Sequence, residues 1–367
     1  MNVAIVNCFD TYEHRVDLLY DFFRKQRNNV RIYTSNFRHI EKVKRTDKKK
    51  DYIYIDSLEY KKNISPGRLY SHHQTAKDLF KRLSGQKIDL LWVLVPPNSF
   101  VKEAAKYKIA HEDTKLVFDI IDMWPETMPL ERFKKIPLVK MWRLLRDNWI
   151  KYADHVVTEC DLFQEKLADV IDPGMMSTIY LAREIKPYNA KPEPLEDKIS
   201  LCYLGSINNI IDIPAIVEIV KRSRAYKPVV LHIIGDGETR QQLIDDVSAA
   251  GAEVIYHGKI YDPDEKQRIF DSCHYGLNVM KDTVYVGLTM KSIDYFEAGL
   301  PIINNIHGDT WDIINEKDLG INFDQSFDSR LRAMDLAEAR GKVRAFFESE
   351  LSVESFENNI RKILEKI

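Results

Sequence analysis

The chain alternates short apolar runs with segments of helical periodicity, and this alternation constrains its fold more than any other feature. Residues 3–7 form an apolar run typical of a strand, residues 15–27 have the spacing of a helix, and residues 30–34 form the next run. A second series of the same kind begins at residues 199–204. Strands that alternate with helices indicate parallel sheets covered by helices. The sequence therefore predicts an α/β protein.

The length of the chain indicates two domains. A chain of 367 residues exceeds what one hydrophobic core usually supports. Residues 186–198 are rich in Pro, Lys and Glu and poor in large apolar side chains, as is typical of a linker. We therefore predict one domain over residues 1–185 and another over residues 190–345.

Composition excludes several classes of protein. Charged residues make up 30% of the chain and its net charge is -2, so nothing indicates a dedicated nucleic-acid binder. Four scattered cysteines have neither metal-ligand spacing nor the pattern of a disulfide framework. The first residues lack the features of a signal peptide, and no apolar window is long enough to span a membrane. We expect a cytoplasmic protein.

Residues 286–304 carry the clearest functional signal. They are predicted to form a loop, a helix, a turn and a strand, with Gly287 in the loop and Thr289 as the N-cap. A helix N-terminus after a glycine loop suits a phosphate, and Lys291 in the first turn adds charge. Asp294 lies on the same helix face and can accept hydrogen bonds from a ribose. The alternative is an ordinary capped amphipathic helix with solvated Lys and Asp side chains.

This stretch resembles the sugar-nucleotide loop and helix of the GT4-like glycosyltransferases, which have the GT-B fold. The family commonly has the pattern Gly-x-Pro-x-Lys-x-x-Glu-Tyr-x-x-x-Gly-x-Pro. The matching residues are Lys291, Tyr295, Gly299 and Pro301. Thr289 replaces the usual proline, and Asp294 replaces the glutamate that binds the ribose. Val286 stands where many members carry an earlier glutamate.

Three other loops of the second half resemble the same family. Gly235-Asp236-Gly237 follows an apolar strand as in the family's Ile-x-Gly-x-Gly signature, although such a turn also suits an ordinary strand-to-helix connection. Lys259 and Ile260 lie in a segment that resembles the family's loop for the nucleotide base. Gly205 is followed by Ser206, where the family often has an arginine that holds the donor diphosphate.

The resemblance implies a GT-B fold, with two facing Rossmann-like, doubly wound parallel-sheet domains, a cleft between them, and residues 346–367 completing the first domain. It implies a hexosyl-type glycosyltransferase of bacterial cell-surface polysaccharide or glycoconjugate biosynthesis. The sequence has no metal-binding Asp-x-Asp at a strand end, so we predict that this enzyme is metal-independent. Such an enzyme moves a sugar from a nucleoside-diphosphate sugar to a glycan, lipid-linked or protein-linked acceptor and needs no further cofactor. The implied donor-binding residues are Gly205, Ser206, Gly235, Gly237, Lys259, Ile260, Gly287, Leu288, Thr289, Lys291 and Asp294, with Arg183 from the interdomain connection.

The first half contains the candidate catalytic residues. Asp119, Asp122 and Glu126 follow or end an apolar strand in the pattern Asp-x-x-Asp-x-Trp-Pro-Glu, which resembles a segment of bacterial surface-polysaccharide glycosyltransferases. Ligands of open α/β sheets bind beyond the carboxyl ends of the strands. If the enzyme inverts, Asp122 or Glu126 is the candidate base for the acceptor. The alternative for Asp122 is a helix cap.

Two further features of the first half have competing interpretations. Residues 38–50 are rich in Lys and Arg, which indicates either a solvated loop or contact with an anionic inner-membrane surface or a lipid-diphosphate acceptor. His72 and His73 lack a metal-ligand partner nearby in the sequence, so we expect exposed polar side chains.

Two other functions compete with sugar transfer. A non-catalytic sugar-nucleotide or glycan-binding subunit would explain the missing cations after Gly205 and the missing glutamate at Val286. A nucleotide-sugar epimerase would use the same fold. The sequence predicts no oligomeric state.

Overall fold

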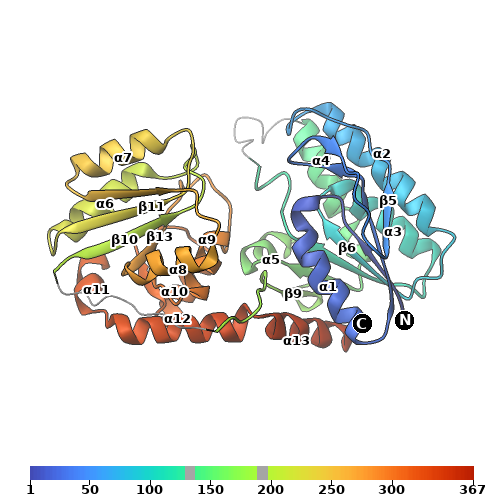
Figure 1. Ribbon diagram of the computed structural model, residues 1–367. Helices are drawn as coiled ribbons and strands as arrows, with labels where there is room; N and C mark the ends of the chain where they lie inside the picture. The colour runs from blue at the N-terminus through green and yellow to red at the C-terminus, as the bar shows by residue number, and fades with distance from the viewer. Residues whose placement is uncertain (129–136, 188–196) are drawn as a thin grey trace. The chain divides into compact units, whose positions relative to one another are not determined.

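The computed structural model describes residues 1–128, 137–187 and 197–367, and it divides into two compact units. Unit 1 comprises Met1–Leu181 together with Phe356–Ile367, and unit 2 comprises Ala182–Ser355 (Figure 1). The end of the chain therefore belongs to the same unit as its beginning. Most of the predicted linker, residues 188–196, lies outside the described residues.

Unit 1 is built on a seven-stranded sheet in the order β5-β2-β1-β6-β7-β8-β9, and every pairing within it is parallel. Every residue of the apolar run in β6 is buried, as expected for a strand covered by helices on both faces. The strands are β1 (Asn2–Val6), β2 (Asn29–Ser35), β5 (Tyr52–Ile55), β6 (Leu90–Val95), β7 (Lys115–Ile120), β8 (His155–Thr158) and β9 (Met176–Thr178). A separate hairpin joins β3 (Phe37–Arg38) to β4 (Val43–Lys44).

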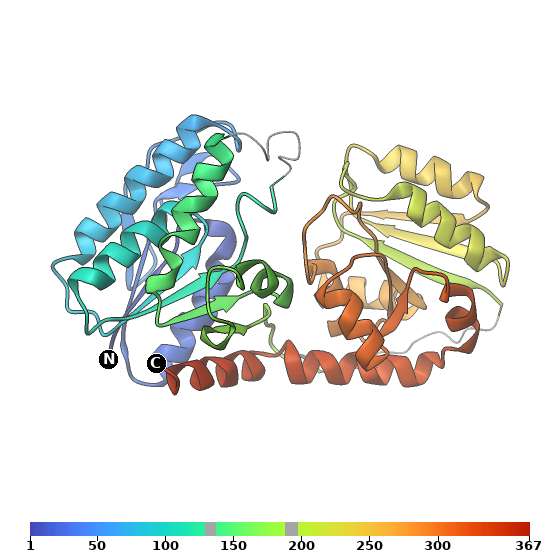
Figure 2. The same cartoon turned by 180° about the vertical axis from the view of Figure 1, so that it is seen from behind.

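Helices cover both faces of the unit 1 sheet. Figure 2 shows α2, α3 and α4 in front of the sheet, with α1 behind it. The last helix, α13, packs on α1, where the Arg361 guanidinium lies 5.6 Å from the centroid of the Phe22 ring and Lys25 pairs with Glu357. The helices are α1 (Glu13–Lys25), α2 (Pro66–Leu83), α3 (Asn98–Ala110), α4 (Pro137–Asp147), α5 (Asp161–Leu167) and α13 (Val353–Leu364).

Unit 2 has a six-stranded sheet in the order β12-β11-β10-β13-β14-β15, again parallel throughout. The strands are β10 (Ile199–Leu204), β11 (Val229–Ile234), β12 (Glu253–Gly258), β13 (Tyr275–Asn278), β14 (Ile302–Asn304) and β15 (Gly320–Asn322). The inward residues of these strands form one apolar core with α6, α7 and α11. Two α/β series predicted from the sequence thus become two separate sheets.

The helices of unit 2 also lie on both faces of their sheet. In Figure 1, α6 and α7 lie on one face, whereas α8 and α9 lie on the other. They are α6 (Ile213–Arg224), α7 (Arg240–Ala249), α8 (Pro263–Asp271), α9 (Met290–Glu297), α10 (Asp309–Lys317), α11 (Phe327–Ala333) and α12 (Leu336–Glu350).

Strand order places the binding regions. In each sheet the chain adds strands first on one side of the unit's first strand and then on its other side. In unit 1, β2 and β5 lie on one side of β1, and β6 to β9 lie on the other; in unit 2, β11 and β12 lie on one side of β10, and β13 to β15 lie on the other. Ligands of doubly wound sheets bind beyond the carboxyl ends of the strands at such a switch point. In unit 2 the switch point lies between β10 and β13, and in unit 1 it lies between β1 and β6.

Candidate functional site

Three loops at the carboxyl ends of β10, β11 and β12 are joined backbone to backbone. Gly205 N donates to Ile234 O at 2.9 Å, Ile207 N to Asp236 O at 3.0 Å, and Gly235 N to Gly258 O at 2.7 Å. The predicted donor-binding residues of these loops, Gly205, Ser206, Gly235, Gly237, Lys259 and Ile260, therefore lie at one edge of the unit 2 sheet. Ser206 and Lys259 are exposed there.

The close approach of these loops explains why Gly235 and Gly237 are glycines. Gly235 has a φ of +140°, and a Cβ on it would lie 1.9 Å from the carbonyl oxygen of Gly205. A Cβ on Gly237 would lie 2.1 Å from the carbonyl oxygen of Ile207. Any larger residue would push the two loops apart. The signature is thus a packing requirement at the switch point and not merely a flexible turn.

The N-terminus of α9 lies beside the same switch point. Thr289 is its N-cap and accepts from Ser292 N at 3.1 Å, as predicted from the sequence. The Thr289 hydroxyl also donates to Asn278 Oδ1 at 2.7 Å, which ties the helix start to the end of β13. The loop before it is held by Thr310, whose N and Oγ1 donate to Gly287 O at 3.0 and 2.6 Å. Leu288 lies between these two anchors and is half-buried.

Lys291 is the most unusual side chain of unit 2. It is 9% exposed, and its Nζ lies 4.7 Å from the centroid of the Tyr203 ring at the end of β10. Among the residues that the structure describes, no hydrogen-bond acceptor reaches this Nζ. Burial lowers its pKa to about 8. Burial of an ammonium group without a counter-ion raises the free energy of the folded protein. An anion bound beside Lys291 would lower it again, so the site favours an anionic ligand.

Asp294 and Arg183 are brought together within unit 2. Arg183 Nη1 lies 2.6 Å from Asp294 Oδ1 and 2.8 Å from Glu297 Oε2, and Lys266 Nζ lies 3.1 Å from the same Asp294 oxygen. The pKa of Arg183 is raised by these two carboxylates, although burial opposes the rise. The charge of Arg183 is therefore shared between two carboxylates, and Asp294 Oδ2 meets no donor from the described residues.

The candidate catalytic carboxylates of unit 1 are both hydrogen-bonded. Asp122 accepts from Trp124 Nε1 at 2.6 Å and from the Thr127 hydroxyl, and burial raises its pKa. Glu126 forms a bidentate salt bridge with Arg146, whose Nη1 donates to Oε2 at 3.0 Å and whose Nη2 donates to Oε1 at 2.8 Å. Neither geometry tests a catalytic role, which stays a prediction.

Asp119, which the sequence places near the ligand-binding edge of the sheet together with Asp122 and Glu126, lies in the core of unit 1. Asp119 is fully buried and pairs with Arg15, whose Nη2 lies 2.8 Å from its Oδ1. Its Oδ2 accepts from Arg15 Nε and Trp92 Nε1, each at 2.9 Å. Asp119 is the residue before the last of β7, and its pair with Arg15 links α1 to the sheet.

The expectation that His72 is an exposed polar side chain is wrong. His72 is 3% exposed, and its ring contacts Phe9 edge-on at 5.2 Å and Trp124 at 6.1 Å between centroids. It occupies the inward face of α2, which the pair of histidines in the sequence did not indicate. Burial lowers its pKa well below the usual value.

Residues 38–50 do not present an array of free cations. Arg38 pairs with Glu41 and Asp47, Lys44 pairs with Asp56, and both Arg45 and Lys49 pair with Glu13. Much of the positive charge of the run is thus neutralised within unit 1.

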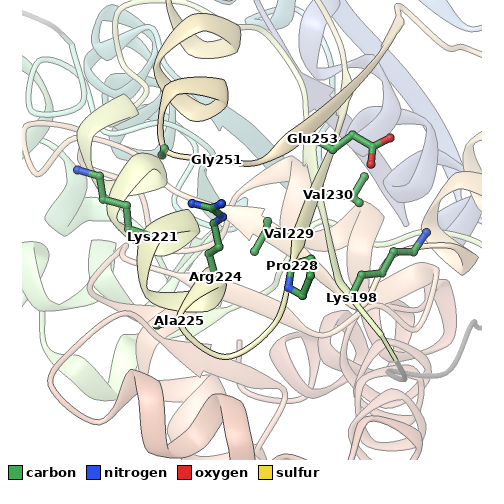
Figure 3. Close-up of a pocket in the computed structure, with 10 residues that line it drawn as sticks. Lys198, Lys221, Arg224, Ala225, Pro228, Val229, Val230, Gly251 and Glu253 are labelled. Atoms are coloured by element: carbon green, nitrogen blue, oxygen red, sulfur yellow. The ribbon is translucent and has the colours of Figure 1, made fainter.

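A surface hollow of about 680 Å³ in unit 2 lies at the wrong end of the sheet for the donor. Its lining includes Val229 and Glu253, which begin β11 and β12, whereas the predicted donor loops follow the other ends of these strands. Figure 3 shows the ammonium groups of Lys198 and Lys221 pointing to opposite sides of it. Its charges do not converge on one point, as a phosphate site would require.

The described part of the chain contains neither a group of metal ligands nor a membrane-spanning helix. Within residues 1–128, 137–187 and 197–367, no three His, Cys, Asp or Glu side chains are grouped as metal ligands. In the same ranges no helix is both long enough and apolar enough to cross a membrane.

Comparison with known proteins identifies the second unit. Residues 198–334 match the family model described as "Glycosyl transferases group 1". Over these residues, unit 2 is similar to the group 1 glycosyltransferases. The match covers all the joined loops and α9, and it confirms the resemblance and the glycosyltransferase assignment predicted from the sequence. Comparison with curated proteins finds no match for this chain.

Solved structures show the fold of the whole chain. The apo lipopolysaccharide outer core galactosyltransferase WaaB is 16% identical, with a TM-score of 0.72 over 100% of both chains. Anabaena HepE in complex with UDP and glucose is 11% identical, with a TM-score of 0.64 over 100% of both chains. WaaG, a glycosyltransferase involved in lipopolysaccharide biosynthesis, is 13% identical, with a TM-score of 0.62 over 98% of this chain and 99% of its own. The predicted GT-B fold class is confirmed.

The structure also draws attention to residues that sequence reasoning missed. Glu159 directly follows β8, and Tyr12 ends the short helix after β1. The sequence did contain a signal for Glu159, since a carboxylate directly after a buried strand lies at the ligand-binding edge of a parallel sheet. No periodicity singled out Tyr12.

Proposed function

We propose that this chain is a hexosyl-type, metal-independent glycosyltransferase that uses a nucleoside-diphosphate sugar. The observation that supports the donor class best is Lys291, a buried ammonium without a counter-ion at the first turn of α9. A helix N-terminus, a switch point and an unpaired cation all favour the same ligand chemistry, a diphosphate. The UDP complex of HepE, a protein of the same fold, supports this choice.

In this proposal, catalysis in unit 2 depends on stabilising the leaving diphosphate. As the bond between the sugar and the diphosphate breaks, negative charge gathers on the diphosphate. The Leu288 and Thr289 amides and the Lys291 ammonium would stabilise that charge, and Ser206 would add its hydroxyl and amide. Asp294 would accept hydrogen bonds from the ribose. Arg183 would act through its pair with Asp294, because its charge is shared with carboxylates.

A panel of nucleotides tests the donor class. UDP, GDP, ADP and CMP, each from micromolar to millimolar concentration, are compared by thermal shift and calorimetry. A ligand at about 100 times its Kd stabilises the folded protein by about 2.7 kcal/mol. If none of the four nucleotides binds, the proposal is overturned. Slow hydrolysis of the matching nucleotide sugar separates an enzyme from a binding subunit, which would bind the donor without turning it over.

Asp294→Asn tests the ribose contact. The substitution keeps the shape but removes charge-assisted acceptance, and we expect it to weaken binding of the nucleotide by about 1.5 to 3 kcal/mol. Glu297→Gln is the matched control, because Glu297 shares the Arg183 pair but has no assigned donor contact. Equal losses in both variants would show that the ion-pair network, and not the ribose, is responsible.

Metal independence has its own test. Activity should survive EDTA, and turnover that disappears with EDTA and returns with Mg²⁺ or Mn²⁺ would contradict it.

The acceptor is proposed to be a glycan, lipid-linked or protein-linked molecule of surface polysaccharide or glycoconjugate assembly, used at the cytoplasmic face of the membrane. Because several Lys and Arg side chains of residues 38–50 form salt bridges with carboxylates, we expect weak and salt-sensitive binding to anionic vesicles. Co-sedimentation with anionic and neutral vesicles at low and high salt measures it. Equal recovery in the supernatant under all conditions would assign the run to a solvated loop.

A further inference from the structure

Three neighbouring strands of unit 2 end in a ladder of side-chain amides. β13, β14 and β15 each end in asparagine, and the sheet register pairs Asn278 with Asn304 and Asn304 with Asn322. Asn278 Nδ2 donates to Asn304 Oδ1, and Asn304 Nδ2 donates to Asn322 Oδ1, each at 2.9 Å. All three residues of this asparagine ladder are at most 2% exposed. Burial of an amide costs free energy unless hydrogen bonds satisfy it, so the ladder depends on complete pairing.

The loop after β14 fixes the direction of the asparagine ladder. Ile306 N donates to Asn304 Oδ1 at 3.1 Å, and Ile306 O accepts from Asn304 Nδ2 at 2.9 Å. A backbone N–H only donates and a backbone carbonyl oxygen only accepts, so the Asn304 amide has a single orientation. Asn278 must therefore turn its Nδ2 towards Asn304, which leaves its Oδ1 to face the other way.

The far end of the asparagine ladder is held by α10. Asn322 Nδ2 donates to Asn315 Oδ1 at 3.0 Å and to Trp311 O at 2.9 Å. These two bonds use both hydrogens of the Asn322 amide, and the bonds to Ile306 and Asn322 use both hydrogens of Asn304. Such a network is rigid, because no member can move without leaving a buried group unpaired.

The near end of the asparagine ladder determines how α9 is capped. Asn278 Oδ1 only accepts, so the Thr289 hydroxyl donates its one proton to it, at 2.7 Å. The lone pairs of that hydroxyl are left to accept from Ser292 N at 3.1 Å, which is the N-cap hydrogen bond. The Ser292 hydroxyl, 2.7 Å away, must then donate to Thr289. An amide direction fixed after β14 thus determines the hydrogen bonding at the first turn of α9.

We propose that the asparagine ladder positions the diphosphate-binding N-terminus of α9. The inference rests on the proposed function, which assigns the Leu288 and Thr289 amides and the Lys291 ammonium to the diphosphate. The first amides of a helix have no partner within the helix, so they can bind a ligand, and their direction depends on the residues that cap the helix. The ladder joins the cap, through Thr289, to β13, β14, β15 and α10. Its three asparagines act through Thr289 and are positioning residues.

The test measures the affinity of Asn304→Leu for diphosphates and for their nucleosides, in the pairs UDP and uridine, GDP and guanosine, and ADP and adenosine. Leucine has a branched end like that of asparagine but forms no hydrogen bond. We expect the Kd of the diphosphate that binds the wild-type protein to rise by about 10- to 100-fold, as is usual when the outer supports of a binding group are lost. The Kd of the matching nucleoside should not change, because Arg183 and Lys266 hold Asp294, the assigned ribose contact, separately. Calorimetry measures the diphosphates, and ligand-observed NMR measures the weaker nucleosides.

Val247→Ala is the matched control for lost stability. Val247 is fully buried on α7, which packs against β12, at the opposite edge of the sheet from β15. Its truncation should lower the unfolding midpoint, as Asn304→Leu does, and leave the Kd of the diphosphate unchanged. Asn322→Ser breaks only the outer pair of the ladder, at the edge strand, and replaces Asn304→Leu if that variant does not fold. Its loss of affinity should be smaller and in the same direction.

Hydrogen exchange tests the asparagine ladder without any nucleotide. The Ser292 amide should exchange faster in Asn304→Leu than in the wild-type protein, whereas Val247→Ala should not single out this amide within unit 2. Thr289→Val keeps the shape of threonine but lacks the hydroxyl, so it should also lose protection of Ser292. Thr289→Ser keeps the hydroxyl and should retain both this protection and the affinity for the diphosphate.

The outcomes distinguish this inference from the function on which it rests. If the wild-type protein binds none of the diphosphates, both are overturned. If it binds one, and Asn304→Leu binds it equally well with unchanged exchange at Ser292, the positioning role alone is overturned. Equal losses for the diphosphate and its nucleoside would also overturn that role, because the ladder would then support the fold of unit 2 in general.

Discussion

A single lysine shows where sequence reasoning succeeds and where it ends. The motif in α9 predicts Lys291 as a donor-binding residue from its neighbours in the chain. Its lack of a partner could not be predicted, because the burial depends on Tyr203 at the end of β10, far away in the sequence. Asp294 shows the same limit, since its ion pairs with Arg183 and Lys266 join segments that only the fold brings together.

Binding of UDP should weaken as pH rises through about 8. Lys291 must be charged to hold the diphosphate, and burial lowers the pKa of the free protein's Lys291 to about 8. Isothermal titration between pH 6 and pH 9.5, in buffers of different ionisation enthalpy, should also show proton uptake on binding near pH 8. Affinity that is constant over this range would contradict an ionised Lys291 in the site.

Lys291→Met should increase the stability of the nucleotide-free protein and decrease its affinity for the nucleotide. The folded-state pKa is lowered, so the ionised lysine is unfavourable at pH 7, and its unfavourable contribution fades only as pH rises from about 8 towards 10.5. Removing it should raise the free energy of unfolding at pH 7 by about 1 to 3 kcal/mol and weaken UDP binding by about 1.5 to 3 kcal/mol. Chemical denaturation and calorimetry measure the two effects. A variant that loses both stability and binding would mean that the side chain is structural.

Elements were predicted better than the contacts between them. The strands β1, β2 and β10 follow from the apolar runs at residues 3–7, 30–34 and 199–204, and the start of α9 follows from Thr289; the structure contains all four elements. The glycine turn after β11 was also recognised, but the reason for its second glycine lies in the carbonyl of Ile207, in a loop that the sequence does not link to it. Hydrophobic periodicity describes one helix or strand at a time, so it cannot predict which loops approach each other.

Gly237→Ala should therefore destabilise unit 2. The added Cβ would lie 2.1 Å from the Ile207 carbonyl oxygen, so the two loops must separate, at a cost of about 1 to 3 kcal/mol. UDP binding should weaken as well. Gly341→Ala is the control, because no atom lies within 4 Å of its added Cβ and it lies inside α12. That change should stabilise the protein by about 0.5 to 1 kcal/mol. Equal unfolding midpoints for both variants would contradict this account.

The buried pair of Arg15 and Asp119 joins α1 to β7 and should be costly to break. Asp119→Ala leaves a guanidinium that is 2% exposed without its counter-ion and should lower the free energy of unfolding by about 3 to 5 kcal/mol. The double variant Arg15→Met, Asp119→Leu should lose less, because no uncompensated charge remains. Urea denaturation of the three proteins measures the difference, and a double variant less stable than Asp119→Ala would contradict it.

At the scale of the whole molecule, the alternation of strands and helices was enough to predict two parallel sheets. The strand orders, with β1 and β10 at the switch points, could not be derived in this way, because order depends on which strands pair across the fold. Family resemblance alone implied that residues 346–367 complete the first domain, and in the structure Phe356–Ile367 belong to unit 1. Nothing in the apolar spacing of α13 says which unit it covers.

A chain shortened to end at Ser352 should lose the stability of unit 1 and keep UDP binding by unit 2. It lacks Phe356, Ile360 and Ile363, each at most 1% exposed, and burial of each such side chain contributes about 1.5 to 3 kcal/mol. Hydrogen exchange should show protection lost in α1 and retained in β10 and β11. A chain that ends at Leu364 is the control. Unchanged protection of α1 in the shorter chain would show that α13 is dispensable.

The return of Phe356–Ile367 to unit 1 also sets the order in which the molecule can be completed during synthesis. Residues 182–355 are contiguous, so unit 2 has all of its residues before Phe356–Ile367 are synthesised. Unit 1 begins first but lacks part of its core until Phe356–Ile367 have been synthesised. Domains usually finish in the order in which they are made. Here the second unit is expected to complete its fold before the first, and the part of α1 that contacts α13 stays exposed until α13 has formed.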